Sequence, residues 1–200
     1  MTVAPDEVTR LLRLRRGHFR LESGHHGDLW LDLETLCLDL EPVRKCADVL
    51  AEQLRAHDVE IVCGPLVEGA FVALLVASAL GVPFTYSVPG AEPDAAGGLY
   101  PMQYRLPGLL RLAVGGKRVA VVNDVVNTGS AVRGTVADLI ACGADPVAIG
   151  TLAVLGELAP VFARDQGIAL ESLVSMRNEV WTPADCPLCA VGAALTSAGV

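Results

Sequence analysis

Short apolar runs and amphipathic stretches alternate between residues 42 and 155, and this pattern is typical of strands that alternate with helices. A helix is predicted to begin at Pro42, because Val43, Ala47, Leu50 and Leu54 recur at helical spacing. The pattern then predicts strands at 59–63, 83–88, 118–122 and 146–155, with helices at 68–80 and 130–142. Apolar strands joined by helices predict an open, doubly wound α/β fold with a mostly parallel sheet flanked by helices.

The segment before this region has a different pattern. Residues 5–16 are predicted to form a helix, with Val8, Leu11, Leu12 and Leu14 on its apolar side. Apolar and polar residues alternate around Phe19 and again from Leu29, which indicates two short strands on either side of a turn at 23–27. We expect one domain over residues 1–200. It would comprise a helix and a small strand element (1–40), an α/β core (41–175) and a C-terminal tail (176–200).

One long segment, residues 89–107, has neither helical nor strand periodicity. It contains four prolines and three glycines. A loop of this length inside a domain is uncommon and is usually either a functional flap or disordered. We interpret it as a flap.

Composition restricts the possible partners. The chain of 200 residues has 15 Lys plus Arg against 23 Asp plus Glu, for a net charge of −8, and only Lys45 and Lys117 are lysines. A net negative charge argues against binding to nucleic acid or to anionic membranes. The charged N-terminus does not resemble a signal peptide, and prolines interrupt the apolar window at 69–91, so a cytoplasmic protein is expected.

The cysteines give a weaker signal. Cys186 and Cys189 form a C-x-x-C pair, which is half of a typical zinc site, and the four histidines lie far upstream in the sequence. We therefore expect a thiol-lined turn in the C-terminal tail rather than a metal site. The other four cysteines lie in apolar surroundings and are expected to be core residues.

The strongest candidate site follows the strand at 118–122. Here Asn123 and Asp124 come at the end of a buried strand, Gly129 allows a tight turn, and Ser130 is expected to be the N-cap of the next helix. Free amides at a helix start favour a phosphate dianion, and a nearby carboxylate suits sugar hydroxyls or Mg²⁺. The same residues are also compatible with a well-capped turn that has no ligand.

The residues Val-Val-Asn-Asp-Val-Val-Asn-Thr-Gly-Ser-Ala, at 121–131, resemble the phosphoribosyl-pyrophosphate motif of type I phosphoribosyltransferases. Among these enzymes the orotate phosphoribosyltransferases are the most similar. Their Phe-x-Leu-x-Ser-Gly element resembles residues 19–24, and their Gly-Pro-x-x-x-Gly turn resembles residues 64–69. The order and spacing of these motifs agree from about residue 8 to residue 156.

The resemblance implies a role for each matching position. The 5′-phosphate of phosphoribosyl pyrophosphate would be bound by Val125, Val126, Asn127, Thr128, Gly129, Ser130 and Ala131. Asp124 and Asn123 would hold the ribose hydroxyls, with Mg²⁺ bound indirectly through Asp124. The pyrophosphate would lie against Leu66, Val67, Glu68 and Gly69, and the acceptor base near Glu22, Ser23 and Gly24. Arg105 would be the cation of the catalytic flap, and the enzyme would be a homodimer.

The matching positions in this chain carry fewer cationic side chains than the same positions in the orotate enzymes. Glu22 and Glu68 replace lysines, Asn123 replaces an acidic residue, and Arg105 is the one cation in the flap segment. Three interpretations remain open. In the first, the protein transfers phosphoribosyl to orotate in pyrimidine nucleotide biosynthesis. In the second, the acceptor is a less acidic base or an amine. In the third, the protein is a non-catalytic regulator that binds the donor.

Overall fold

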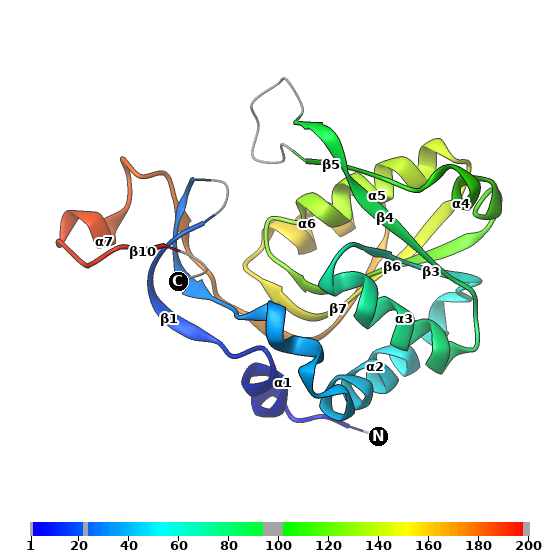
Figure 1. The fold of residues 1–200 in the computed structure, drawn as a ribbon, viewed down its shortest axis with the longest axis horizontal. Helices are drawn as coiled ribbons and strands as arrows, with labels where there is room; N and C mark the ends of the chain where they lie inside the picture. The colour runs from blue at the N-terminus through cyan, green and yellow to red at the C-terminus, as the bar shows by residue number, and fades with distance from the viewer. Residues whose placement is uncertain (1, 22–23, 94–101, 198–200) are drawn as a thin grey trace.

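The main chain forms two separate sheets (Figure 1). The computed structural model describes residues 2–21, 24–93 and 102–197. The larger sheet has the strand order β5-β4-β3-β6-β7-β8. Its strands are β3 (Ile61–Pro65), β4 (Phe84–Pro93), β5 (Met102–Arg105), β6 (Arg118–Val126), β7 (Asp145–Leu155) and β8 (Ala169–Met176). All neighbouring pairs are parallel except β4 and β5, which are antiparallel.

Helices cover both faces of the larger sheet. One apolar cluster joins α2 (Leu40–Leu54) and α3 (Glu68–Leu80) to sheet residues such as Val122, and a second joins α5 (Ser130–Ala141) and α6 (Leu158–Gln166) to residues such as Val121. Successive residues of β6 therefore face opposite clusters, as the alternation of side chains along a strand requires. The fold class predicted from the apolar pattern is confirmed.

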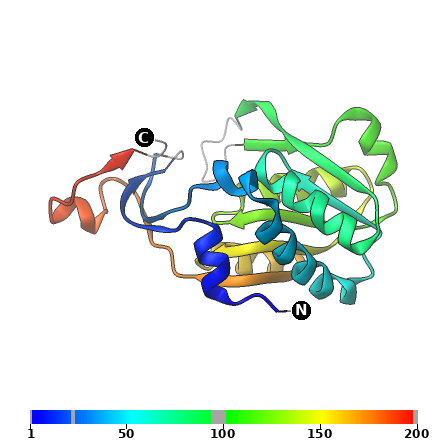
Figure 2. The same ribbon diagram turned by 60° about the horizontal axis from the view of Figure 1, so that its bottom comes forward.

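The smaller sheet, which we call the hood, combines the two ends of the chain. Its order is β10-β1-β2-β9, and it lies to one side of the larger sheet (Figures 1 and 2). The strands are β1 (Arg15–Arg20), β2 (His26–Trp30), β9 (Val180–Trp181) and β10 (Thr196–Ser197), and the short helix α7 (Pro187–Ala190) lies between β9 and β10. The C-terminal tail is therefore part of the hood.

Several predicted boundaries were wrong. The first helix, α1 (Pro5–Leu11), ends before the predicted residue 16, because the chain turns at Arg13 (φ 47°) and β1 begins at Arg15. The second predicted strand ends at Trp30, and Leu33–Leu38 forms the 3-10 helix η1. The strand predicted to end at 88 continues to Pro93, because pairing with β5 extends it. A further helix, α4 (Gly108–Ala113), follows the flap segment.

The apolar window at 69–91 consists of α3 and most of β4, as its prolines and glycines indicated. Within the described residues, no helix combines the length and the apolar character needed to cross a bilayer.

Gly64 in β3 provides a test of how tightly the sheet packs on α3. A Cβ atom at this position would lie 2.5 Å from Ala73 Cβ and 2.6 Å from Ala70 Cα, so the helix would have to move. We expect Gly64→Ala to lower the free energy of unfolding by about 1–3 kcal/mol, the usual cost of overpacking, as measured by urea denaturation. Gly108→Ala is the matched control, because nothing lies within 4 Å of a Cβ there. An equal effect of the two substitutions would contradict the packing.

Candidate functional site

The predicted phosphate loop connects β6 to α5. The strand continues to Val126, and residues 127–129 then make the turn into α5. Gly129, with φ 80°, is the N-cap, and Ser130 is the first residue of the helix, so the expectation that Ser130 is the cap was wrong by one position. The reason is that the turn needs a positive φ at the cap, which glycine adopts without strain. Residues of the loop and of the helix start line a cavity of about 150 Å³.

Side chains from other elements hold this loop in place. The Asn178 side-chain amide donates a hydrogen bond to Asn127 Oδ1 at 2.9 Å. From α5, Arg133 donates to the carbonyl oxygens of Thr128 and Leu158, at 3.3 and 3.1 Å, and its guanidinium group lies 4.2 Å from the centre of the Phe162 ring. The backbone of the loop is therefore fixed without a ligand, which lowers the entropic cost of binding an anion there.

Asn123 brings the phosphate loop and the predicted pyrophosphate turn together. Its side-chain amide donates to the carbonyl oxygen of Val125 at 2.7 Å. Its Oδ1 atom lies so close to Gly69, at the start of α3, that a Cβ atom on Gly69 would collide with it. The turn at Leu66–Gly69 connects β3 to α3, and its Leu66–Val67 peptide bond is cis. Because β3 and β6 are parallel neighbours, the two turns lie at the same edge of the sheet.

Asp124 is almost completely buried, with 6% of its surface exposed. Its carboxylate accepts a hydrogen bond from the Val125 amide at 2.7 Å, while its carbonyl oxygen accepts one from the Thr151 hydroxyl at 2.9 Å. Burial raises the pKa of Asp124 to about 7, although the Val125 amide opposes the shift, and the nearby Glu68 carboxylate raises the pKa further. A buried carboxylate with a second carboxylate nearby favours the binding of hydroxyl donors or of a cation.

Cys37, on η1, is a site neighbour that the sequence did not indicate. Burial raises the pKa of its thiol, and the charges of Asp124 and Glu68 raise it further. The thiol therefore lies within electrostatic reach of both carboxylates. Only the tertiary packing of η1 against α3 places it there, because no motif connects residue 37 with residues 68 and 124.

The remaining predicted residues are placed less completely. Arg105 is exposed on β5 and donates to the Gln103 side chain at 3.0 Å. Gly24 lies in the β1–β2 turn with φ 80°. Glu22 and Ser23 lie outside the described residues, as do residues 94–101 of the flap. The described ends of the flap form the β4–β5 ribbon, and Asp138 of α5 accepts hydrogen bonds from the Leu106 amide and from Arg111 beside it.

A larger cavity of about 570 Å³ adjoins the phosphate loop, and sequence reasoning missed it. Residues after β7 and β8 line it, and Asn127 belongs to both cavities. Its charged residues are Glu157, Arg177 and Glu179, and Arg177 is paired with Glu179 at 3.4 Å. The larger cavity therefore has one more carboxylate than cations.

The chain is similar in sequence and in fold to known phosphoribosyltransferases. The orotate phosphoribosyltransferase of Thermotoga maritima is 32% identical over 186 residues, which are 90% of this chain and 88% of the relative. The solved structure of orotate phosphoribosyltransferase from Aeropyrum pernix has a TM-score of 0.66 and 24% sequence identity. This match covers 86% of this chain and 92% of that chain. The solved structure of adenine phosphoribosyltransferase from Thermoanaerobacter pseudethanolicus has a TM-score of 0.68 and 19% sequence identity. This match covers 86% of this chain and 100% of that chain. No model of a protein family matches the chain.

The parallel sheet with its strand–loop–helix site defines the fold as that of the type I phosphoribosyltransferases. The identity and the coverage of the curated relatives go further. The chain belongs to the orotate phosphoribosyltransferase family, whose members are pentosyltransferases.

The raised pKa of Asp124 predicts how stability depends on pH. Between pH 3.8 and about 7 the folded state keeps a proton on Asp124 that the unfolded chain releases, so the free energy of unfolding falls as the pH rises through this window. We expect Asp124→Asn to remove this decrease, so that the variant gains stability relative to wild type up to about pH 7. Urea denaturation of metal-free protein at a series of pH values measures the difference. Parallel curves for the two proteins would refute the burial of the charge.

Proposed function

We propose that the protein transfers the phosphoribosyl group from phosphoribosyl pyrophosphate to orotate, giving orotidine monophosphate and pyrophosphate in pyrimidine nucleotide synthesis. The observation that best supports this is the preformed loop after β6, whose cavity is next to the buried Asp124 and the Gly69 turn. The names of the curated relatives support the orotate acceptor. We also propose a homodimer and a cytoplasmic location, as the family resemblance implies.

In this proposal, the phosphate loop binds the 5′-phosphate. The positive end of α5 and the free amides around Gly129 attract a dianion, and the Thr128 and Ser130 hydroxyls add donors. The cavity of about 150 Å³ has room for a phosphate group. The Leu66–Gly69 turn then receives the pyrophosphate at the neighbouring strand end, beside Asn123, which occupies the space that a side chain on Gly69 would need.

Asp124 and Asn123 hold the ribose in this arrangement. A buried carboxylate accepts hydrogen bonds from the 2′- and 3′-hydroxyls, and these donors would lower the cost of its charge. The same carboxylate and the half-buried Glu68 are oxygen ligands of the kind Mg²⁺ takes, directly or through water. When bound, Mg²⁺ supplies charge neutralisation for the departing pyrophosphate.

The chain itself contributes positioning and shielding to the transfer. The bond between the ribose C1 and the pyrophosphate oxygen breaks, and a bond from C1 to a ring nitrogen of the base forms. The sugar passes through an oxocarbenium-like state, which the buried Asp124 carboxylate stabilises electrostatically. The β4–β5 flap, with Arg105 on its described part, would close over the site, exclude water and prevent hydrolysis.

A second candidate acceptor follows from the charges at the site. Orotate is an anion, yet the cavity next to the phosphate loop has Glu157 and Glu179 against a single paired arginine, and Glu68 lies at the pyrophosphate turn. A less acidic base or an amine would meet less repulsion there. The third possibility, a regulator that binds the donor without turnover, would need only the phosphate loop.

Donor binding tests the site directly. We expect phosphoribosyl pyrophosphate with Mg²⁺ to raise the melting temperature of the wild type and to have little effect on Asp124→Ala, because the ribose hydroxyls lose their acceptor. Asp145→Ala is the control, since Asp145 is an exposed residue at the opposite end of the same sheet. Equal stabilisation of wild type and Asp124→Ala would refute the assignment of the ribose site.

Acceptor specificity is tested by magnesium-dependent pyrophosphate release with a panel of bases. We expect release with orotate and none with adenine, hypoxanthine or nicotinate. Pyrophosphate release with only one of the other bases would identify that base, in place of orotate, as the acceptor. A protein that binds the donor but releases no pyrophosphate with any base would be the regulator.

A further inference from the structure

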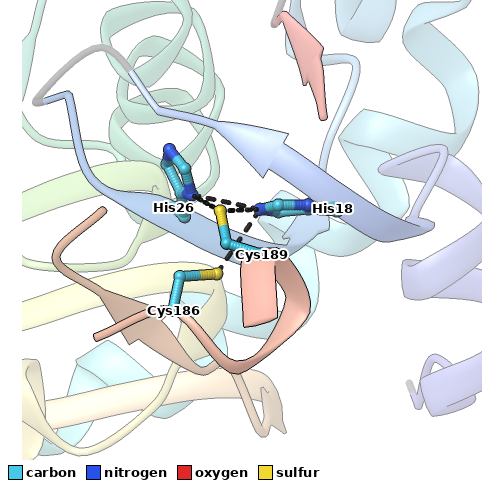
Figure 3. A group of neighbouring side chains, drawn as sticks. All are labelled: His18, His26, Cys186 and Cys189. Atoms are coloured by element: carbon cyan, nitrogen blue, oxygen red, sulfur yellow. Dashed lines mark hydrogen bonds between the residues drawn. The ribbon is translucent and has the colours of Figure 1, made fainter. Parts of the chain in front are cut away.

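Two histidines and two cysteines from opposite ends of the chain meet in the hood (Figure 3). His18 lies on β1 and His26 on β2, and these strands pair antiparallel, so the two rings lie side by side. Cys186 is the N-cap of α7, and Cys189 lies within that helix. The C-x-x-C pair expected to be a plain thiol-lined turn therefore has two histidine partners, and these are 160 or more residues away in the sequence.

The four ligand atoms lie to within about 1 Å of the spacing around a tetrahedral ion. Nε2 of His18 is 3.1 Å from Nδ1 of His26, and the distances from sulfur to nitrogen are 3.3, 3.4 and 3.8 Å. All four ligand atoms lie within 4.8 Å of one another. A tetrahedral zinc ion, with nitrogen at about 2.0–2.1 Å and sulfur at about 2.3 Å, separates its ligand atoms by about 3.3–3.8 Å.

The lone pair of His18 Nε2 is directed towards the other three residues. His18 Nδ1 lies 3.0 Å from the carbonyl oxygen of Ala193, so Nδ1 has the proton and Nε2 faces the other three residues as an acceptor. A backbone carbonyl bound to the second ring nitrogen is the usual support for a metal-binding histidine. His18, His26 and Cys186 are each at most 6% exposed, and both cysteines are free thiols.

We propose that these four residues bind one structural Zn²⁺ ion. Two imidazole nitrogens and two thiolates fill the four positions that zinc takes in closed sites, which leaves none for a substrate. Binding releases one proton from each thiol, and the two thiolate charges balance the charge of the ion. Thiolates are softer ligands than oxygen atoms, and two thiolates with two imidazoles in tetrahedral geometry favour zinc. Mg²⁺ and Ca²⁺ prefer oxygen ligands.

Only part of the hood packs on the core. Strand β2 contributes Leu29, which is buried in the cluster under α2 and α3. Phe19 on β1 and Cys186 at the start of α7 are buried but belong to neither of the two large clusters. The outer strands β9 and β10 are two residues long and each pairs with its neighbour at only two positions. A bound ion would join α7 to the β1–β2 hairpin.

The experiment measures metal in the full-length protein, purified without chelators in the presence of a thiol reductant. We expect about one zinc per chain by inductively coupled plasma mass spectrometry, and a loss of roughly tenfold or more in Cys189→Ser and His26→Ala. Cys189 is exposed, so its substitution by serine leaves the packing intact. Cys142→Ser and His25→Ala are the controls, because both lie outside the cluster, and we expect them to retain zinc.

Cobalt gives a second readout that does not depend on how the protein was produced. Co²⁺ added to metal-free protein is expected to show the absorption of a tetrahedral site with thiolate ligands, absent in Cys189→Ser. A wild-type chain with neither zinc nor this spectrum would overturn the proposal, as would a Cys186–Cys189 disulfide in freshly purified protein. Neither measurement uses phosphoribosyl pyrophosphate or a base, so failure here is distinct from failure of the proposed transferase activity.

Discussion

The buried carboxylate at the end of β6 is the constraint on which the rest of the site depends. Because β6 lies between β3 and β7, its last polar side chains have protein on both sides, and a charge on Asp124 needs partners. Neighbouring residues meet this need in part: the Val125 amide donates to the carboxylate, and Thr151 fixes the backbone by donating to the Asp124 carbonyl oxygen. In the proposed function, the adjacent hydroxyls of a sugar would supply further donors.

The distribution of charge is compatible with the proposed binding of a phosphorylated donor by a chain of net charge −8. Both lysines and most of the arginines described have structural pairings away from the site, such as Lys117 with Glu60 and Arg111 with Asp138. In the proposed function, the phosphate loop would use backbone amides and the dipole of α5 instead, and these do not depend on the number of cations. The proposed acceptor site has no such substitute for cations, so the charge of the base would decide which acceptor binds.

The hood shows a different solution to a shortage of interactions. This four-stranded sheet is made from both ends of the chain, its outer strands are two residues long, and its buried residues Phe19 and Cys186 lie outside the two large apolar clusters. Small units of this kind usually depend on disulfides, metals or a larger neighbour. The hood also contains the β1–β2 turn with Gly24, where the family resemblance places the acceptor. A zinc ion that fixes this hairpin would therefore act on the site through structure alone.

Local patterns determined the four inner strands of the larger sheet, β4, β3, β6 and β7, because each buried strand has an apolar pattern that neighbouring residues specify. The two edge strands, β5 and β8, were not predicted from the sequence. The turn from β6 into α5 was also predictable, because Asp124, Gly129 and Ser130 lie close together in sequence, and only the cap was misplaced by one residue. The tertiary structure alone decided the rest. The packing of η1 places Cys37 near the carboxylates, and the return of the tail to β1 and β2 joins His18 to Cys186. These residues are separated by 31 to 168 positions in sequence, and a local periodic pattern cannot specify interactions over such separations.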